Sequence, residues 1–90
     1  MARLSEDEIQ KGLARLSGWA RDGERIRRQY KFKSFAEAIA FTNRVAGLAE
    51  DADHHPDILV EYDKVTLTLS SHDAGGLTER DFRLAARIDT

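Results

Sequence analysis

The sequence predicts an α+β fold in which a four-stranded antiparallel sheet is packed against three helices, in the order α-β-β-α-β-β-α. Three helix starts are marked by a hydroxyl residue followed three positions later by an acid, which is the spacing of a capping box. Two pairs of short alternating segments are each joined by a turn, as in β-hairpins. Because hairpins join antiparallel strands and no long crossover is indicated, we expect the whole sheet to be antiparallel.

Each predicted helix begins where a hydroxyl can accept a hydrogen bond from a free backbone N–H. The first helix is expected to bury Ile9, Leu13 and Leu16. The third is expected to run from Glu79 toward the C-terminus with Phe82 in the core. The capping pairs are Ser5 with Glu8, Ser34 with Glu37, and Thr78 with Asp81.

The second predicted helix is the longest and carries the widest apolar stripe. A stripe of this width is expected to face both the sheet of its own chain and a partner subunit. Its members are Phe35, Ile39, Thr42, Val45 and Ala49, with Phe41 and Leu48 beside them.

The first hairpin is predicted to turn at Asp22-Gly23, between a short strand around the buried Trp19 and a longer strand. In the second hairpin, residues 58–62 and 65–69 alternate between apolar and polar, and the turn is predicted at 63–64. Tyr62 is expected to lie in the core at the end of the first of these strands.

Length and composition limit the classes of protein to consider. A chain of 90 residues is expected to form one domain, 1–90, with a core small enough to favour burial between subunits. The net charge of −2 and the strand-like alternation of the basic residues 25–33 argue against direct nucleic-acid binding. The absence of cysteine excludes disulfides and thiolate catalysis. No signal peptide or membrane-spanning run is found in the sequence, which predicts a cytoplasmic protein.

All three histidines, His54, His55 and His72, lie in one third of the sequence. Imidazole has an ordinary pKa of about 6.5 and exchanges protons readily at neutral pH. With the turn at 63–64, the hairpin register places His72 opposite His55. Glu50 lies one helical turn before the histidine pair and is placed to orient an imidazole. This grouping predicts acid–base chemistry on a small molecule.

Other interpretations of these residues are structural. A single histidine is most often a surface residue, Glu50 fits a solvated helix position, and Asp81 is explained by its capping box alone. A zinc site is not expected, because His54 and His55 would point to opposite faces of an extended segment. The sequence also has no pair of histidines at helical spacing.

The histidines belong to a longer pattern: Glu50-x3-His54-His55-Pro56-x5-Tyr62-x9-His72-x8-Asp81. This pattern resembles that of the pterin-4a-carbinolamine dehydratase family, and the resemblance covers most of the chain. Further matching positions are Gly18-Trp19, Phe32, Phe35, Val45-Ala46, Ala49-Glu50 and Gly76-Leu77-Thr78.

The resemblance implies the α+β fold, a homo-dimer or a tetramer, and no metal or organic cofactor. It implies dehydration of 4a-hydroxytetrahydrobiopterin to quinonoid dihydrobiopterin, with a functional link to aromatic amino acid hydroxylases such as phenylalanine hydroxylase. Under it, the catalytic residues would be His54, His55 and His72. Further substrate-binding positions would be Asp53, Ser70, Ser71 and Asp73, with Glu50 and Asp81 in supporting positions.

For the reaction itself, we expect His55 and His72 to form the acid–base pair, and His54 to position the pterin and assist with the N5 proton. An alternative comes from animal members of the family that bind a homeodomain-type transcription factor, and from relatives that assist assembly of other proteins. In that case the stripe of the second helix would be the binding surface, and the histidines would be incidental.

Overall fold

The elements of the computed structural model, which describes residues 2–90, follow the predicted order and confirm the α+β class. No helix among these residues is both long and apolar enough to cross a membrane. The elements are α1 (Glu6–Ala14), β1 (Ala20–Asp22), β2 (Arg25–Lys31), α2 (Phe35–Ala52), β3 (Asp57–Glu61), β4 (Lys64–Leu69), the short 3₁₀ helix η1 (His72–Ala74) and α3 (Glu79–Ile88).

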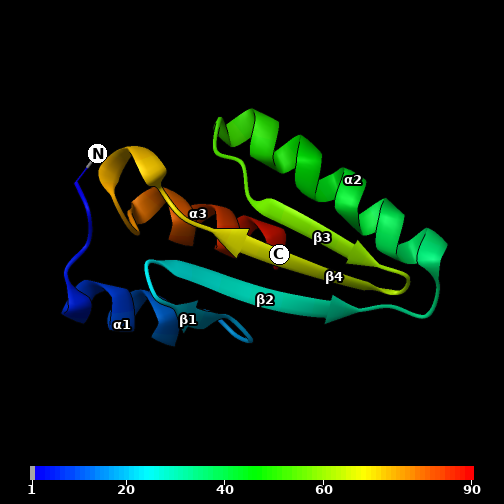
Figure 1. Ribbon diagram of the computed structural model, residues 1–90, viewed down its shortest axis with the longest axis horizontal. Coiled ribbons are helices and arrows are strands. Elements are labelled where there is room, and N and C mark those ends of the chain that lie inside the picture. Colours follow the sequence, from blue (N-terminus) through cyan, green and yellow to red (C-terminus); the bar gives the residue numbers. More distant parts are fainter. Residues whose placement is uncertain (1) are drawn as a thin grey trace.

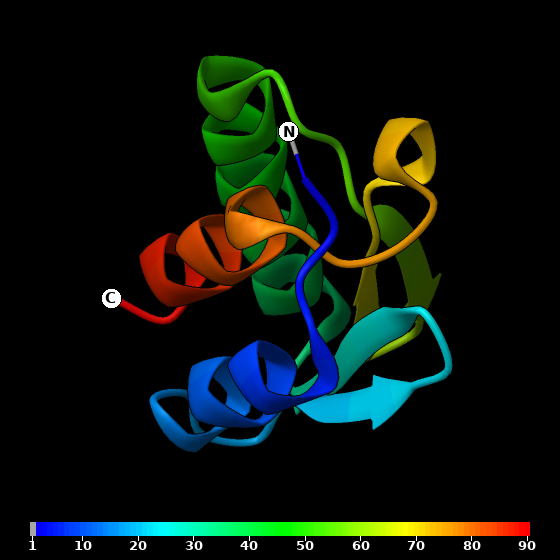
Figure 2. The ribbon, with the colours of Figure 1, turned by 90° about the vertical axis from the view of Figure 1, so that its left-hand side faces the viewer.

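The four strands lie in the order β1-β2-β4-β3, and every neighbouring pair is antiparallel, as predicted. The strands β2 and β4 form the centre of the sheet, and β1 and β3 form its edges (Figure 1). The three helices lie on one face, and the other face is left uncovered by any helix of the described chain (Figure 2). The apolar core therefore lies between the helices and a single face of the sheet.

The first hairpin turn lies one residue later than predicted. Asp22 pairs with Arg25, which leaves Gly23 and Glu24 as the turn residues. Gly23 has a φ of 63°, so the left-handed residue comes first in the turn, whereas the Asp-Gly rule placed glycine second. Trp19 precedes β1 and is buried, in agreement with the prediction.

The second hairpin turn lies one residue earlier than predicted. Glu61 pairs with Lys64, which leaves Tyr62 and Asp63 as the turn residues. Tyr62 has a φ of 55°, and such a left-handed backbone is uncommon for a bulky residue, so no sequence signal marked it. Its side chain is among the most exposed apolar groups, at 71%, and its predicted place in the core is wrong.

The helix starts agree with the capping prediction, with one difference. The capping boxes of α1 and α3 are closed in both directions. At α2, the Ser34 hydroxyl accepts from the Glu37 N–H at 3.1 Å, as expected. The Glu37 carboxylate, however, accepts from the N–H of Lys33 at 3.1 Å, one residue before the position that a capping box requires.

The predicted stripe of α2 is divided between the core and the surface. Val45 and Ala49 are buried, and the ring of Phe41 lies 4.6 Å from that of Tyr30 on β2. Phe35, at the start of the stripe, is 51% exposed. The start of the stripe, at Phe35, is therefore open to solvent in the single chain.

Asp89, which follows α3, fastens the end of that helix to the sheet. Its carboxylate accepts from the indole N–H of Trp19 at 2.7 Å and from the Tyr30 hydroxyl at 2.5 Å. It also accepts from the Arg28 guanidinium at 3.0 Å. Burial of the phenol, and then the hydrogen bond and charge of Asp89, raise the pKa of Tyr30 above its ordinary value of 10.0.

We predict that Tyr30 ionises at a clearly higher pH than a free tyrosine. Between the two pKa values the folded state keeps the phenol proton that the unfolded state has lost, so stability falls as the pH rises above about 10. In the Tyr62→Phe variant Tyr30 is the only tyrosine, so an ultraviolet absorbance titration of that variant reports this phenol alone. An ordinary tyrosine titration in the folded variant would contradict the prediction.

Candidate active site

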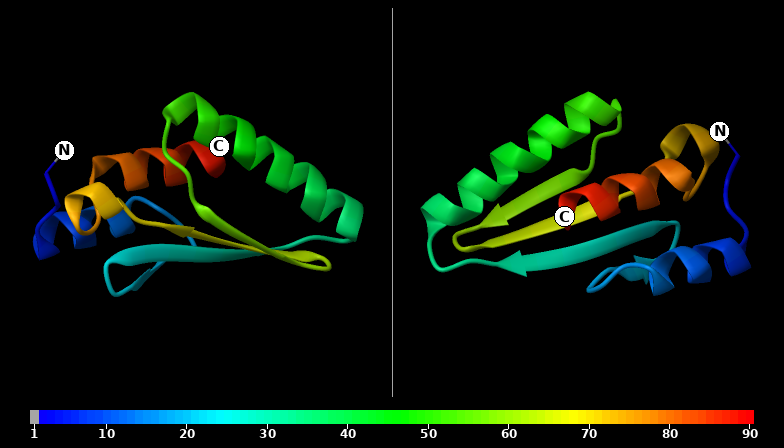
Figure 3. Two further views of the ribbon diagram at one scale, coloured as in Figure 1. Left: turned by 45° about the horizontal axis from the view of Figure 1, so that its top comes forward. Right: turned by 180° about the vertical axis from the view of Figure 1, so that it is seen from behind.

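The segments that carry the three histidines leave the sheet at the same end. β3 begins at Asp57, which pairs with Thr68 near the end of β4. The loop 53–56, which precedes β3, and the turn η1, which follows β4, therefore lie at one end of the molecule (Figure 3). His54 and His55 are in the loop, and His72 is the first residue of η1.

The predicted pairing of His72 with His55 is wrong. In β3 and β4, Val60 pairs with Val65 rather than with Leu67, because the turn begins at residue 62. β4 ends at Leu69, and the chain then turns into η1 instead of continuing the ladder. Within residues 2–90, no hydrogen bond joins the ring of His72 to either of the other histidines.

The end of α2 sets the direction of the histidine loop. Asp53 takes the left-handed conformation, with a φ of 50°, and its N–H bonds the Glu50 carbonyl at 3.2 Å. The N–H of His54 returns to the Ala49 carbonyl at 3.1 Å, in the manner of a Schellman cap. Beyond this cap His54 turns inward and is buried, while His55 is exposed.

His54 is held in the interior by Asp81. Its Nε2 lies 2.6 Å from Oδ1 of Asp81, and the two residues are 7% and 0% exposed. A carboxylate bonded to one ring nitrogen fixes both the orientation and the tautomer of an imidazole. The other nitrogen, Nδ1, has no hydrogen-bond partner in the part of the chain that the structure describes.

Asp81 forms more hydrogen bonds than the predicted capping box requires. Its second oxygen, Oδ2, accepts from the Thr78 N–H at 2.9 Å, which is the expected cap. The same oxygen accepts from the Ser71 hydroxyl at 2.9 Å, and the Ser71 and Thr78 hydroxyls lie 2.8 Å apart. The carboxylate therefore joins the start of α3, the exit of β4 and the histidine loop.

His55 contacts Glu50. The sequence predicted that Glu50 would orient an imidazole, and the structure shows that this imidazole is His55. The contact joins Nε2 of the ring to a carboxylate oxygen, and both side chains are more than half exposed. Glu50 therefore orients His55 at the surface, much as Asp81 orients His54 in the interior. His55 remains accessible to a ligand, whereas His54 is almost covered.

His72 lines an open cavity of about 340 Å³ on the β2 side of this end of the sheet. The Ser70 hydroxyl beside it donates to the Glu24 carbonyl at 2.9 Å. The other residues around the cavity are Glu24, Arg25, Gly75 and Gly76. Glu24 and Arg25 were not expected at this site, because they come from the first hairpin. They reach this site only because Ile26 pairs with Leu69 across the centre of the sheet.

Asp73 follows His72 and is bound by Arg80 of α3. The guanidinium lies 2.6 Å from the carboxylate, and this hydrogen bond holds the pKa of Asp73 below its ordinary value. Arg80 was not recognised as a site residue from the sequence. Among residues 2–90, no group of three or more His, Cys, Asp or Glu side chains is arranged to hold a metal ion.

The family model for pterin 4 alpha carbinolamine dehydratase matches residues 2–90, almost the whole chain. The chain belongs to this family. A protein of Koribacter versatilis, named as a candidate pterin-4-alpha-carbinolamine dehydratase, is 51% identical over 86 residues, which cover 96% of this chain and 92% of that protein. Membership confirms the resemblance of the sequence and, with it, the expectation of a dehydratase enzyme.

Two solved structures share the fold. A transcriptional coactivator/pterin dehydratase from Brucella melitensis superposes with a TM-score of 0.93 at 38% identity, over 97% of this chain and 95% of that one. A pterin dehydratase-like protein described as a RuBisCO assembly factor of the alpha-carboxysome gives a TM-score of 0.68 at 29% identity, over 80% and 86%. Family proteins of this fold are thus described with more than one kind of activity.

We predict that Asp81→Ala lowers the free energy of unfolding by about 3–5 kcal/mol, because it leaves buried groups of His54, Ser71 and Thr78 without a partner. Urea unfolding of the variant and the wild type measures the difference. Asp73→Ala is the matched control, since it removes an exposed carboxylate from an ion pair and should have a much smaller effect. Equal losses in the two variants would contradict this account of the buried carboxylate.

Proposed function

We propose that the protein dehydrates 4a-hydroxytetrahydrobiopterin, or a closely related 4a-hydroxytetrahydropterin, to the quinonoid dihydropterin and water. The observation that carries the proposal is the placement of two exposed imidazoles, His55 and His72, at one end of the sheet beside a buried third. Family membership and the names of the relatives support the same chemistry.

The reaction removes the hydroxyl from C4a and the proton from N5 and forms a double bond between these atoms. An acid protonates the departing hydroxyl, which leaves as water, while a base accepts the N5 proton. Imidazoles can serve as either partner at neutral pH, and each such group contributes roughly 10²–10⁴-fold to the rate. The base then releases its proton to solvent and the acid takes one up, which restores both groups.

We assign the acid–base steps to His55 and His72, because their rings are accessible. Glu50 orients His55 through its Nε2. Because Asp81 occupies Nε2 of His54, that histidine would position the pterin and assist with the N5 proton through Nδ1. The main contribution of His54 would therefore be to position the pterin.

The remaining proposed substrate contacts are residues that also form hydrogen bonds within the protein. Asp53 caps α2, and Ser71 donates its hydroxyl to the buried Asp81. The Ser70 hydroxyl donates to the Glu24 carbonyl, and the Asp73 carboxylate accepts from Arg80 of α3. We therefore propose that these residues meet the pterin through backbone groups and free lone pairs, in positions that their own hydrogen bonds fix.

The test is the dehydration of 4a-hydroxytetrahydrobiopterin that is generated in situ by an aromatic amino acid hydroxylase. We expect His55→Ala and His72→Ala each to lower kcat by roughly 10²–10⁴-fold with a smaller change in KM, because each removes an acid or base. Glu61→Gln, an exposed substitution at the far end of β3, is the control and should keep full turnover.

Two results would count against the proposal. Full turnover in both histidine variants would refute the acid–base assignment. No acceleration by well-folded wild-type protein would refute the dehydratase activity itself.

We also propose that the protein forms a homo-dimer or a tetramer. β3 is an edge strand, and its side chains Ile58 and Leu59 are 37% and 54% exposed. An exposed apolar edge favours pairing with a strand of a second copy. The exposed Phe35 on α2 offers a further apolar contact.

Leu59→Lys is expected to lower the mass of the assembly measured by light scattering at micromolar concentration, because a charge at the edge opposes strand pairing. Tyr62→Ser changes a still more exposed apolar residue in the turn beyond the strand and should leave the mass unchanged. A wild type that is monomeric, or a Leu59→Lys variant of unchanged mass, would argue against the edge as an interface.

A second candidate function is that of an assembly or coactivator module acting through α2. The exposed Phe35 and the description of the more distant structural neighbour as an assembly factor favour it. In this case the histidines would be incidental, so the dehydration assay decides between the two functions. A link to phenylalanine hydroxylase belongs to the enzymatic proposal, because such hydroxylases release the substrate.

A further inference from the structure

The position of the His72 ring depends on the backbone of its loop. The ring is exposed and has no hydrogen-bond partner within residues 2–90, whereas the other two histidines are each held by a carboxylate. The loop closes on itself, since the Ser71 N–H donates to the Gly76 carbonyl at 3.0 Å and the Gly75 N–H to the His72 carbonyl at 3.1 Å. Whatever holds this small loop therefore places the ring.

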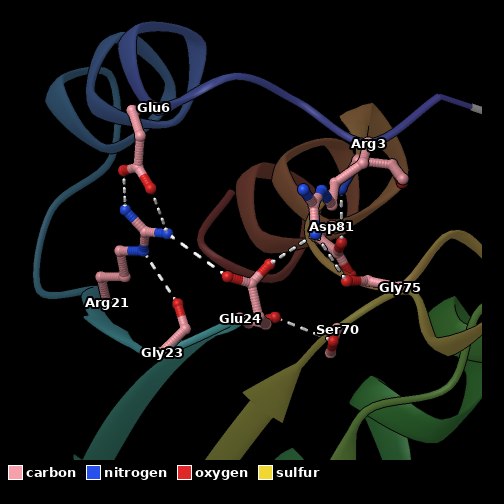
Figure 4. Close-up of polar contacts among 9 residues, drawn as sticks. Arg3, Glu6, Arg21, Gly23, Glu24, Ser70, Gly75 and Asp81 are labelled. Atoms are coloured by element: carbon pink, nitrogen blue, oxygen red, sulfur yellow. Dashed lines mark hydrogen bonds and ion pairs between the residues drawn. The ribbon is translucent and has the colours of Figure 1, made fainter.

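Two segments that are distant in sequence hold the loop (Figure 4). From the first hairpin, the carbonyl of Glu24 accepts from the Ser70 hydroxyl at 2.9 Å. From the N-terminal segment, the Arg3 guanidinium donates to the Gly75 carbonyl at 3.4 Å. The same guanidinium lies 3.8 Å from the Glu24 carboxylate, so the two segments also hold each other.

Further contacts fix the side chains of Arg3 and Glu24, which together we call the clamp. Arg21 lies 3.7 Å from the second oxygen of Glu24 and is itself bound to Glu6 of α1 (Figure 4). The Leu4 N–H donates to the Leu77 carbonyl at 2.8 Å, which keeps the N-terminal segment along the exit of the loop. The Glu24 carboxylate therefore lies between two guanidinium groups.

Gly76 shows how closely the clamp covers the loop. A Cβ at this position would lie 2.4 Å from Oε2 of Glu24 and 2.6 Å from Cδ of Arg3. Both distances are shorter than any van der Waals contact, so the side chains of Arg3 and Glu24 pack directly on the backbone of Gly76. Their ion pair is thus coupled to the position of the loop by packing as well as by hydrogen bonds.

We propose that Arg3 and Glu24 are positioning residues for His72. The proposal rests on the dehydratase function proposed above, in which His72 exchanges a proton with the pterin. By holding residues 70–76 against the sheet, the clamp places the ring at the cavity that it shares with Glu24 and Arg25. An acid or base that is displaced by about 1 Å can lose up to roughly 10²-fold in rate, so the clamp bears on catalysis without taking part in proton transfer.

The test compares Arg3→Met, which keeps the stem of the side chain and removes its charge and donors, with Arg3→Lys, which keeps the charge. We expect Arg3→Met to lower kcat by about tenfold, with a small change in KM and an altered pH profile of kcat, and Arg3→Lys to recover part of the loss. Lys11→Met is the matched control, because it removes an exposed ion pair with Asp7, at 3.1 Å, that does not touch the loop.

Amide hydrogen exchange supplies a readout that does not depend on activity. Faster exchange at Ala74, Gly75 and Gly76 is expected in Arg3→Met and not in Lys11→Met, because these amides close the loop. An active wild type with unchanged kcat and unchanged exchange in Arg3→Met would overturn the positioning role alone. An inactive, folded wild type would overturn the dehydratase function and the positioning role together, and the exchange data would then describe a purely structural clamp.

Discussion

The candidate site depends on the hydrogen bonds of one buried carboxylate, that of Asp81. An ionised group without contact with water costs several kcal/mol unless it is paired and hydrogen-bonded. Here the imidazole of His54, the hydroxyl of Ser71 and the N–H of Thr78 supply these partners. The same bonds tie together three segments that are far apart in sequence. The geometry of the site and the stability of the interior therefore cannot be separated.

This arrangement divides the histidines into two kinds. His54 is covered and tied to a carboxylate of α3, so its place is determined by the core. His55 and His72 lie at the surface, one guided by Glu50 and the other by the backbone of its loop. Three residues that look alike in the sequence thus differ in the freedom of their rings. That difference, more than residue type, separates the proposed roles in the pterin reaction.

Local signals in the sequence were sufficient for the elements but not for their alignment. Ser5 and Thr78 marked their helices correctly because a capping box depends only on residues within one turn. The turn at Tyr62 was displaced by one residue because an aromatic residue with positive φ has no sequence signature. That small displacement was enough to remove the expected partner of His72.

The parts of the site that the sequence did not reveal depend on contacts between distant segments. That Glu50 orients an imidazole was predicted, because it lies within a few residues of the histidine pair, although the sequence did not identify His55 as the partner. Arg3 and Glu24 were not, because they come from the N-terminal segment and the first hairpin and meet the His72 loop only in the finished sheet. Asp81 was recognised as a cap, while its bond to His54 spans 27 residues and left no local pattern.

The central pairing of the sheet has a consequence for how the molecule folds. Each hairpin can close by itself from neighbouring residues, but β2 and β4 are separated in sequence by the whole of α2 and must find each other across it. Pairings of such long range are formed late and slowly, because the entropy of closing the intervening chain is lost before the contacts repay it. The cavity at His72 lies at one end of the pairing between β2 and β4. A chain with both hairpins formed but not yet docked would have its secondary structure in place and no cavity at His72.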